Sequence, residues 1–236
     1  MGKCILLEND MFHTNLGLSK RKGSSVDRQV MADTFTRLQF EVRIYSNLSV
    51  KEINNTLEKT ALEDHSNRDM LAGNNISLMP GQGPKCLFSF SVVVLSHGNE
   101  GILYGYDHSY PAHKIWEPFT ADKWVNVILS IITIIISRSS SLAGKPKLFF
   151  IQACQGSKMD SGTEVGHTLL KWQPIFALPK VKMARTMTDS LATYRTPLYA
   201  DFLLAHSTVA GFYSWRNTVS GSWFIQVSLG KPWEND

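Results

Sequence analysis

The chain has 236 residues, of which 43% are hydrophobic and 19% charged, so it can bury a substantial core and is not disordered as a whole. Its net charge of +4 is small and spread along the sequence, which disfavours a nucleic-acid-binding protein but suits a basic pocket for an acidic substrate. Three cysteines argue against a disulfide framework and favour a reducing compartment. The first residues lack the apolar region of a signal peptide, so we expect a cytoplasmic protein.

Apolar runs alternate with segments of helical spacing, which predicts an α/β fold. Strands are expected at residues 4–7, 40–45, 88–95, 147–152 and 200–206, and helices at about 25–38 and 49–62. Ser49 followed by Glu52 forms a capping-box pattern at the start of the second helix. Residues 101–105 predict a small hairpin, and about 111–119 a helical or irregular segment. This order predicts a mostly parallel, doubly wound sheet with helices on both faces.

Two stretches fit this scheme poorly. Residues 70–86 are rich in Asn, Gly and Pro, as a loop is, although they directly precede a core strand. Residues 125–136 are almost wholly apolar, yet shorter than the roughly 20 residues that a membrane span needs. We therefore expect no membrane insertion, and the apolar run should pack as an extra strand or helix.

Cys154 follows an apolar strand and is itself followed by Gln155 and Gly156, while His97 follows another strand in the motif Ser-His-Gly. Ligands bind at the carboxyl ends of parallel strands, where these two side chains should meet. A thiol nucleophile needs a histidine for proton transfer and donors for the oxyanion, and the backbone N–H groups of Gly98 and Cys154 can serve as donors. Taken singly, the cysteine and the histidine would be ordinary core residues; together they favour catalysis.

The stretch Gln-Ala-Cys-Gln-Gly at 152–156, with His97 upstream, fills the caspase signature, and the chain resembles the effector caspases over about two thirds of its length. Further matching motifs are 63–66 (EDHS), 95–98 (LSHG), 144–149 (GKPKLF) and 212–217 (FYSWRN). The resemblance implies a three-layer α/β/α sandwich with a mostly parallel central sheet. It also implies an apoptotic cysteine endopeptidase that cleaves proteins after aspartate, without metal or cofactor, as a homodimer or paired with other caspases.

The same resemblance assigns the substrate-binding residues. Arg21, Gln152 and Arg216 would hold the substrate aspartate, since an arginine fork suits a carboxylate. Ser214 and Arg216 would pair with the substrate backbone as an added strand, and Tyr213 and Trp215 would wall the adjoining pocket. Without the resemblance, a solvated Arg21 on a basic loop and an aromatic core cluster at 212–215 would be the simpler interpretations.

The family pattern divides the chain into a large-subunit-like region at 1–158, a linker at 159–196 and a small-subunit-like region at 197–236. Asp189, in Thr-Asp-Ser, and Asp160 are candidate processing sites, although each can equally be a plain loop aspartate. Inserts at about 70–88 and 124–141 interrupt the pattern, and Asp236 lies ten residues after Gln226, where the resemblance fades.

From these departures we expect that the C-terminal part lacks the last sheet strand of the family. An alternatively spliced form would lack this strand in the same way. Three functions remain open. The first is a caspase-type protease. The second is a catalytically impaired chain that binds and modulates full-length caspases. The third is another cysteine hydrolase on a similar sheet, which Arg21 and Arg216 disfavour.

Overall fold

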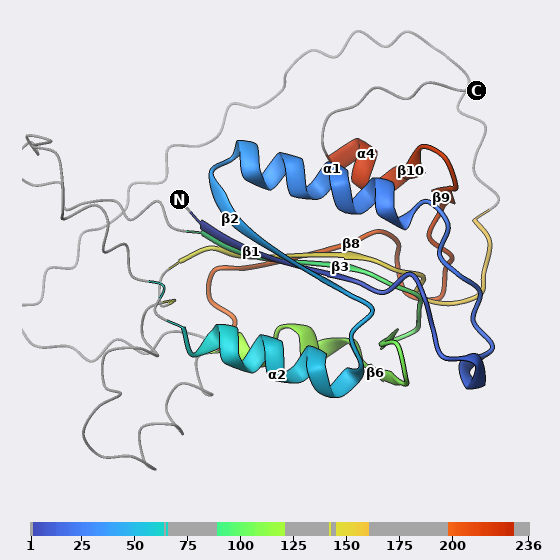
Figure 1. Ribbon diagram of the computed structural model, residues 1–236, viewed down its shortest axis with the longest axis horizontal. Coiled ribbons are helices and arrows are strands. Elements are labelled where there is room, and N and C mark those ends of the chain that lie inside the picture. The colour runs from blue at the N-terminus through green and yellow to red at the C-terminus, as the bar shows by residue number, and fades with distance from the viewer. Residues whose placement is uncertain are drawn as a thin grey trace, which may run out of the picture.

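A single parallel sheet forms the centre of the protein (Figure 1). The computed structural model describes residues 2–63, 65, 89–120, 142, 145–160 and 198–228. Within them the strand order is β2-β1-β3-β7-β8 and every neighbouring pair is parallel. The strands are β1 (Gly2–Glu8), β2 (Phe40–Ser46), β3 (Ser89–Leu95), β7 (Lys147–Gln152) and β8 (Phe202–His206). All carboxyl ends therefore lie at one edge, on the right in Figure 1.

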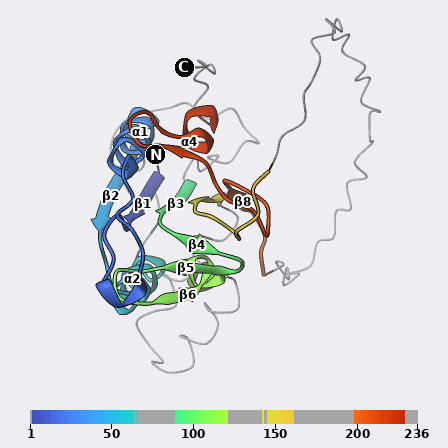
Figure 2. The same cartoon turned by 90° about the vertical axis from the view of Figure 1, so that its right-hand side faces the viewer.

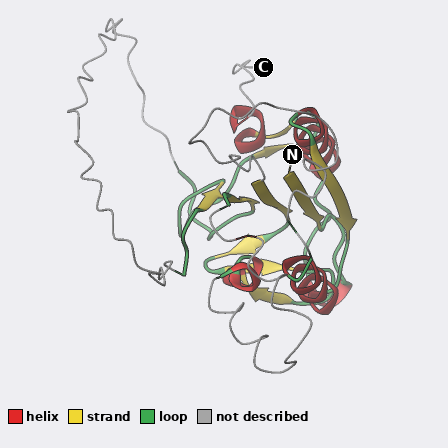
Figure 3. Cartoon of the chain, turned by 90° about the vertical axis from the view of Figure 1, so that its left-hand side faces the viewer, coloured by secondary structure: helices red, strands yellow, loops and turns green. Residues whose placement is uncertain are grey.

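Helices cover both faces of the sheet, so the predicted three-layer α/β/α architecture is confirmed (Figures 1 and 3). Helices α1 (Ser24–Arg37) and α4 (Trp223–Ser228) lie on one face and α2 (Val50–Ala61) on the other. The remaining elements are η1 (Thr14–Leu16), β4 (Gly98–Asn99), β5 (Ile102–Tyr104), β6 (Ser109–Pro111), η3 (Ala112–Ile115), η4 (Glu117–Phe119), β9 (Arg216–Asn217) and β10 (Gly221–Ser222). β5 and β6 lie on the side of α2 (Figure 2).

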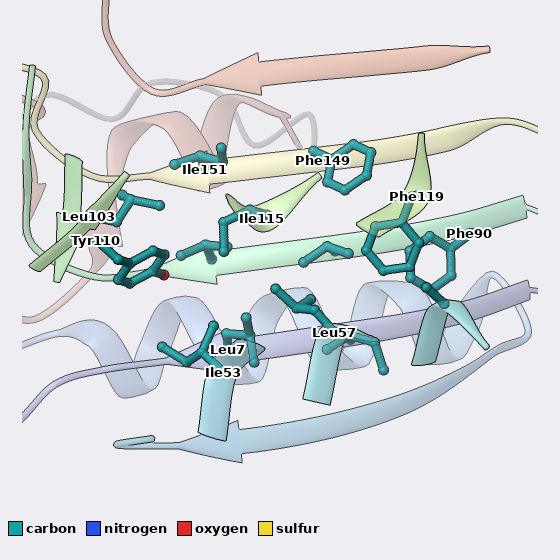
Figure 4. Packing of buried hydrophobic residues seen from close by; sticks show 14 of the residues in the cluster. Leu7, Ile53, Leu57, Phe90, Leu103, Tyr110, Ile115, Phe119, Phe149 and Ile151 are labelled. Carbon is teal, nitrogen blue, oxygen red and sulfur yellow. The ribbon is translucent and has the colours of Figure 1, made fainter. Parts of the chain in front are cut away.

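The central strands are buried on both faces, which explains why they are continuously apolar rather than alternating. In β1, Ile5 and Leu7 pack in the core layer beneath α2, whereas Cys4 and Leu6 pack in the layer beneath α1. All four side chains are at most 1% exposed. Figure 4 shows the first of these layers, where Leu57 of α2 faces the phenylalanines of the sheet.

The capping box predicted for α2 is present. The N–H of Glu52 donates to the Ser49 hydroxyl at 3.3 Å, and the N–H of Ser49 donates to the Glu52 carboxylate at 2.9 Å. These two bonds satisfy donors that the first turn of a helix otherwise leaves free. The helix therefore begins where its sequence indicates.

Some boundaries differ from the sequence prediction. The hairpin expected at 101–105 is part of a three-stranded antiparallel sheet, β4-β5-β6, because the chain pairs again after Tyr104. Strand β8 begins at Phe202 and not at residue 200, since Asp201 takes a positive φ of 63° in a turn. The two inserts, residues 161–196 of the linker and Asp189 lie outside the described residues.

Candidate active site

The site lies at the carboxyl edge of the sheet, which faces the viewer in Figure 2. Strand β2 pairs with one edge of β1, and the next strand of the sheet, β3, pairs with the opposite edge of β1. The direction in which strands are added to the sheet therefore reverses between β1 and β3. Such a reversal opens a crevice outside the strand ends, where ligands bind in open α/β sheets. The segments that follow β1, β3 and β7 carry Arg21, His97 and Cys154 respectively.

Strand register brings His97 level with Cys154. Leu95 is the partner of Gln152 in the β3–β7 pairing, and each catalytic candidate lies two residues farther along its own strand. The backbones stay close beyond the strands, because a Cβ built on Gly98 would lie 2.6 Å from the Cys154 carbonyl oxygen. Only glycine permits this approach, so Gly98 serves to hold the histidine segment against the cysteine segment.

The His97 ring is oriented by a backbone group. Its Nε2 lies 2.9 Å from the carbonyl oxygen of Ser19. A carbonyl can only accept, so Nε2 carries the hydrogen and Nδ1 is left to take up a proton. Phe12 covers the ring at a centroid distance of 4.9 Å. Burial lowers the pKa of His97 below its ordinary value, the Ser19 contact opposes this shift, and Arg21 with Arg216 add to it.

Cys154 is held by a short ladder between the segment that follows it and the segment that follows β8. The N–H of Gln155 donates to the Phe212 carbonyl at 2.9 Å, and the N–H of Tyr213 donates to the Lys158 carbonyl at 2.9 Å. At the sulfur itself, the N–H of Ser214 donates to Sγ at 3.4 Å. The thiol therefore lies against Ser214, one of the two residues that the family resemblance assigns to the substrate backbone.

Arg21 is a buried cation with spare donors. Its side chain is 1% exposed, and its Nη1 donates to the Ser24 hydroxyl at 2.6 Å. Its Nε and Nη2 have no hydrogen-bond partner within the described residues. Burial lowers the pKa of Arg21 to about 9, with a smaller contribution from Arg216, so the guanidinium stays charged at neutral pH.

The loop that carries Arg21 is fixed by Asn47, which follows β2. The Asn47 side-chain oxygen accepts from the N–H groups of Asp10 and Met11, each at 3.0 Å. The Asp10 carbonyl in turn accepts from the N–H of Arg21 at 2.9 Å. The position of the buried guanidinium thus depends on a residue that lies in another part of the sequence.

Arg216 lies beside the loop that carries Arg21, and Gln152 lies beside Ser214. Arg216 donates from Nε to the Lys22 carbonyl at 2.9 Å, beside the Arg21 loop. Gln152 donates from Nε2 to the Ser214 hydroxyl at 2.8 Å, and its Oε1 is buried without a partner within the described residues. Both arginines interact electrostatically with Cys154. Both predicted arginines therefore lie near enough to Cys154 to influence its charge, and their role toward a substrate stays a prediction.

Aromatic side chains extend the site on one side. Tyr213 and Trp215 are each 45% exposed, so they do not form the closed core cluster that was the simpler interpretation. Trp223 stacks on Trp215 at a centroid distance of 5.8 Å and is itself 43% exposed. Half-exposed stacked rings are suited to contact an apolar part of a peptide.

Sequence inspection missed four contributors to this site: Ser19, Asp27, Ser222 and Trp223. Ser19 acts through its backbone carbonyl, for which no residue type gives a signal. Asp27 and Ser222 meet only because α1 and the β9–β10 hairpin pack together (Figure 1). Trp223 gives a weak signal, since it is a tryptophan eight residues after Trp215 with no aromatic residue between the two.

Two further features bear on the chemistry. No group of three or more His, Cys, Asp or Glu side chains in the described part of the chain could hold a metal ion. None of the described helices is long and apolar enough to cross a membrane.

The fold is therefore a parallel α/β sheet whose adjacent strands β3 and β7 lead into His97 and Cys154. The chain belongs to the caspase family, because the Caspase domain pattern matches residues 1–74 and 85–230. It is 37% identical to caspase-1 of Spodoptera frugiperda over 228 residues, which are 96% of this chain and 58% of the relative. It is 36% identical to caspase-3 of Oryctolagus cuniculus over 231 residues, which are 96% of this chain and 63% of the relative.

The fold agrees with a solved member of the family. The crystal structure of caspase-1 from Spodoptera frugiperda superposes with a TM-score of 0.67 at 34% sequence identity. The match covers 95% of this chain and 66% of that chain. The chain thus spans about three fifths of the length of the two curated relatives.

Proposed function

We propose that the chain is a caspase-type cysteine endopeptidase that cleaves proteins after aspartate, with Cys154 as nucleophile and His97 as acid and base. The observation that carries the proposal is the Arg21 guanidinium. It is buried, charged, electrostatically coupled to Cys154, and has two nitrogens without partners among the described residues. A buried cation with free, fork-shaped donors is suited to a carboxylate, and Arg216 adds a second positive charge.

The proposed reaction begins with proton transfer from the Cys154 thiol to Nδ1 of His97. The thiolate attacks the backbone carbonyl carbon of the substrate aspartate. A C–S bond forms as the π electrons of the carbonyl move to its oxygen. The N–H groups of Gly98 and Cys154 stabilise this oxyanion. His97 then gives its proton to the departing amine, which breaks the C–N bond and leaves a thioester. Water, deprotonated by His97, hydrolyses the thioester and releases the new carboxyl end.

Recognition of the substrate would combine two contacts. The aspartate side chain would be held by Arg21, Arg216 and Gln152, whose free amide oxygen would face a backbone N–H or a water. The substrate backbone would replace Cys154 as the partner of Ser214 and add a strand there. Tyr213 and Trp215 would flank the preceding substrate residue.

The family resemblance supports finer proposals. The protein would act in the cytoplasm during apoptosis and would start as a zymogen with regions 1–158, 159–196 and 197–236. It would form a homodimer or pair with other caspases, and no nucleic acid or membrane would take part. Asp160 is exposed, as a processing site must be, and Asp189 is the other candidate.

A peptide-reporter assay tests the main proposal. The purified chain is given two reporters that differ only in Asp or Asn before the cleaved bond, since Asn keeps the shape and removes the charge. We expect turnover of the Asp reporter alone, and none by Cys154→Ala. Equal turnover of both reporters would contradict aspartate specificity, and turnover by Cys154→Ala would contradict the nucleophile.

One observation favours the second candidate function, that of a binding partner of full-length caspases. Strand β8 pairs only with β7 among the described strands, and its Leu203 and Leu204 are 52% and 39% exposed. An apolar edge strand is a ready surface for pairing with another chain. A chain without turnover that binds purified full-length caspase-3 and changes its activity would support this function. Loss of that binding in a Leu203→Lys variant would locate it at β8.

A further inference from the structure

Asp27 is a buried carboxyl group that the proposed mechanism does not use. It lies in the first turn of α1 and is 1% exposed. Both of its oxygens accept hydrogen bonds from Ser222, which lies 195 residues later: Oδ1 from the N–H at 2.6 Å, and Oδ2 from the hydroxyl. A buried carboxyl group is costly unless it is hydrogen-bonded, so this double contact ties two distant segments together.

Ser222 belongs to the hairpin that carries Arg216. Strands β9 and β10 are antiparallel, and Ser222 is the direct partner of Arg216 in their register. Gly221 takes a positive φ of 92°, and a Cβ built on it would lie 2.5 Å from Oδ1 of Asp27. The hairpin backbone therefore approaches the carboxylate as closely as only glycine permits.

A second contact joins the same two segments. Arg216 donates to the Lys22 carbonyl, and a Cβ built on Gly23 would lie 2.6 Å from the Asn217 carbonyl oxygen. The start of α1 thus contacts both segments: Ser24 accepts from Arg21, and Asp27 accepts from Ser222, the register partner of Arg216.

The charge of Asp27 also suits this place. Arg21 and Arg216 are like charges that disfavour each other, and Asp27 favours the charged form of both. None of the ion pairs within 4.0 Å in the described residues joins Asp27 to either arginine, so it does not neutralise them by direct contact. Nε and Nη2 of Arg21 therefore stay without a partner among the described residues.

We propose that Asp27 is a positioning residue for the aspartate pocket, which holds Arg216 beside Arg21 by accepting two hydrogen bonds from Ser222. The inference rests on the proposed function for its consequence, the loss of aspartate preference. Its structural part, the fixing of the β9–β10 hairpin, stands independently of catalysis. Asp27 touches neither substrate nor thiol in this assignment and acts only through Ser222 and Arg216.

The test compares Asp27→Ala with Asp33→Ala in the same chain. Asp33 is a matched control, because it lies on the same helix, is exposed and, among the described residues, accepts only from Gln29. Two quantities are measured in each variant, at a temperature well below the melting temperature of that variant. One is the rate at which Cys154 is alkylated by an aspartyl fluoromethyl ketone relative to its asparaginyl counterpart. The other is amide hydrogen exchange over residues 215–222, which needs no activity.

We expect Asp27→Ala to lower the aspartyl preference about tenfold or more, as loss of hydrogen bonds to a charged group does, and to speed exchange in the hairpin. Asp33→Ala should change neither quantity. Asp27→Asn should retain most of both, since its amide can still accept from the Ser222 N–H and donate to the hydroxyl. Equal effects of Asp27→Asn and Asp27→Ala would overturn the inference, because charge and not hydrogen bonding would then be responsible.

The two proposals fail in different ways. A wild-type chain that alkylates without aspartyl preference contradicts the proposed function, and hairpin exchange alone then decides the positioning role. Unchanged exchange in Asp27→Ala overturns the positioning role, whatever the wild-type preference. Faster exchange in Asp27→Ala supports it even if the aspartate pocket is wrong.

Discussion

The carbonyl oxygen of Ser19 lies 2.9 Å from Nε2 of His97 and thereby selects the tautomer of the candidate catalytic base. The bond reaches across 78 residues, from the loop after β1 to the end of β3. It leaves Nδ1 free to act as the acceptor that the proposed mechanism requires, with a backbone carbonyl as the group that orients the ring. The same loop carries Arg21, so the proposed substrate contact and the orientation of the His97 ring depend on one segment.

The pH profile should reflect the burial of His97. Its pKa in the folded chain is lowered, chiefly by burial, so the ring stays neutral and able to accept a proton below its ordinary value of 6.5. We expect the acid limb of kcat/KM for the Asp reporter to lie below that pH. Phe12→Ala should move the limb upward, since water would reach the ring. A wild-type limb at or above 6.5 would contradict the burial argument.

Arg21→Met should abolish aspartate recognition. Removal of a charge-assisted contact to the substrate carboxylate should lower kcat/KM about 100-fold. Arg37→Met removes the same charge from the exposed far end of α1 and should have little effect. Matched loss in both variants would show that net charge and not the pocket is responsible.

Alkaline pH should weaken the same recognition. The pKa of Arg21 is lowered to about 9, so the cation is present below that pH and is lost as the pH rises through it. The pKa of Arg216 is lowered as well, mainly by burial. We therefore expect the Asp-over-Asn preference to fall across this range. If the Asp-over-Asn preference stays constant as the pH rises past about 9, burial does not lower the pKa of Arg21 as described.

Much of the fold follows from residue pattern, whereas the site follows only in part. Strands such as β3 and the start of α2 at Ser49 could be predicted because burial on both faces and capping leave local signals. Cys154 and His97 could be paired because parallel strands end at one edge. The Asp27–Ser222 contact and the Ser19 carbonyl could not be predicted, since they depend on packing between segments that are far apart in the sequence.

Stability should depend on the core layer between α2 and the sheet. Leu57 is fully buried in that layer, whereas Leu62, just after the same helix, is 49% exposed. Leu57→Ala should lower the free energy of unfolding by about 2–5 kcal/mol, through lost burial and the cavity left behind. Leu62→Ala should cost well under about 1 kcal/mol. Denaturant unfolding measures both, and equal costs would contradict the packing described for α2.

The site of covalent capture tests most directly whether Cys154 is the nucleophile beside an aspartate pocket. The chain is treated with the aspartyl fluoromethyl ketone or its asparaginyl counterpart, and the adduct is mapped by peptide mass spectrometry. Cys4 is an internal control, because burial raises its pKa to about 12 and it should not react. We predict an adduct at Cys154 with the aspartyl compound alone. An adduct at another cysteine, or equal capture by both compounds, would contradict it.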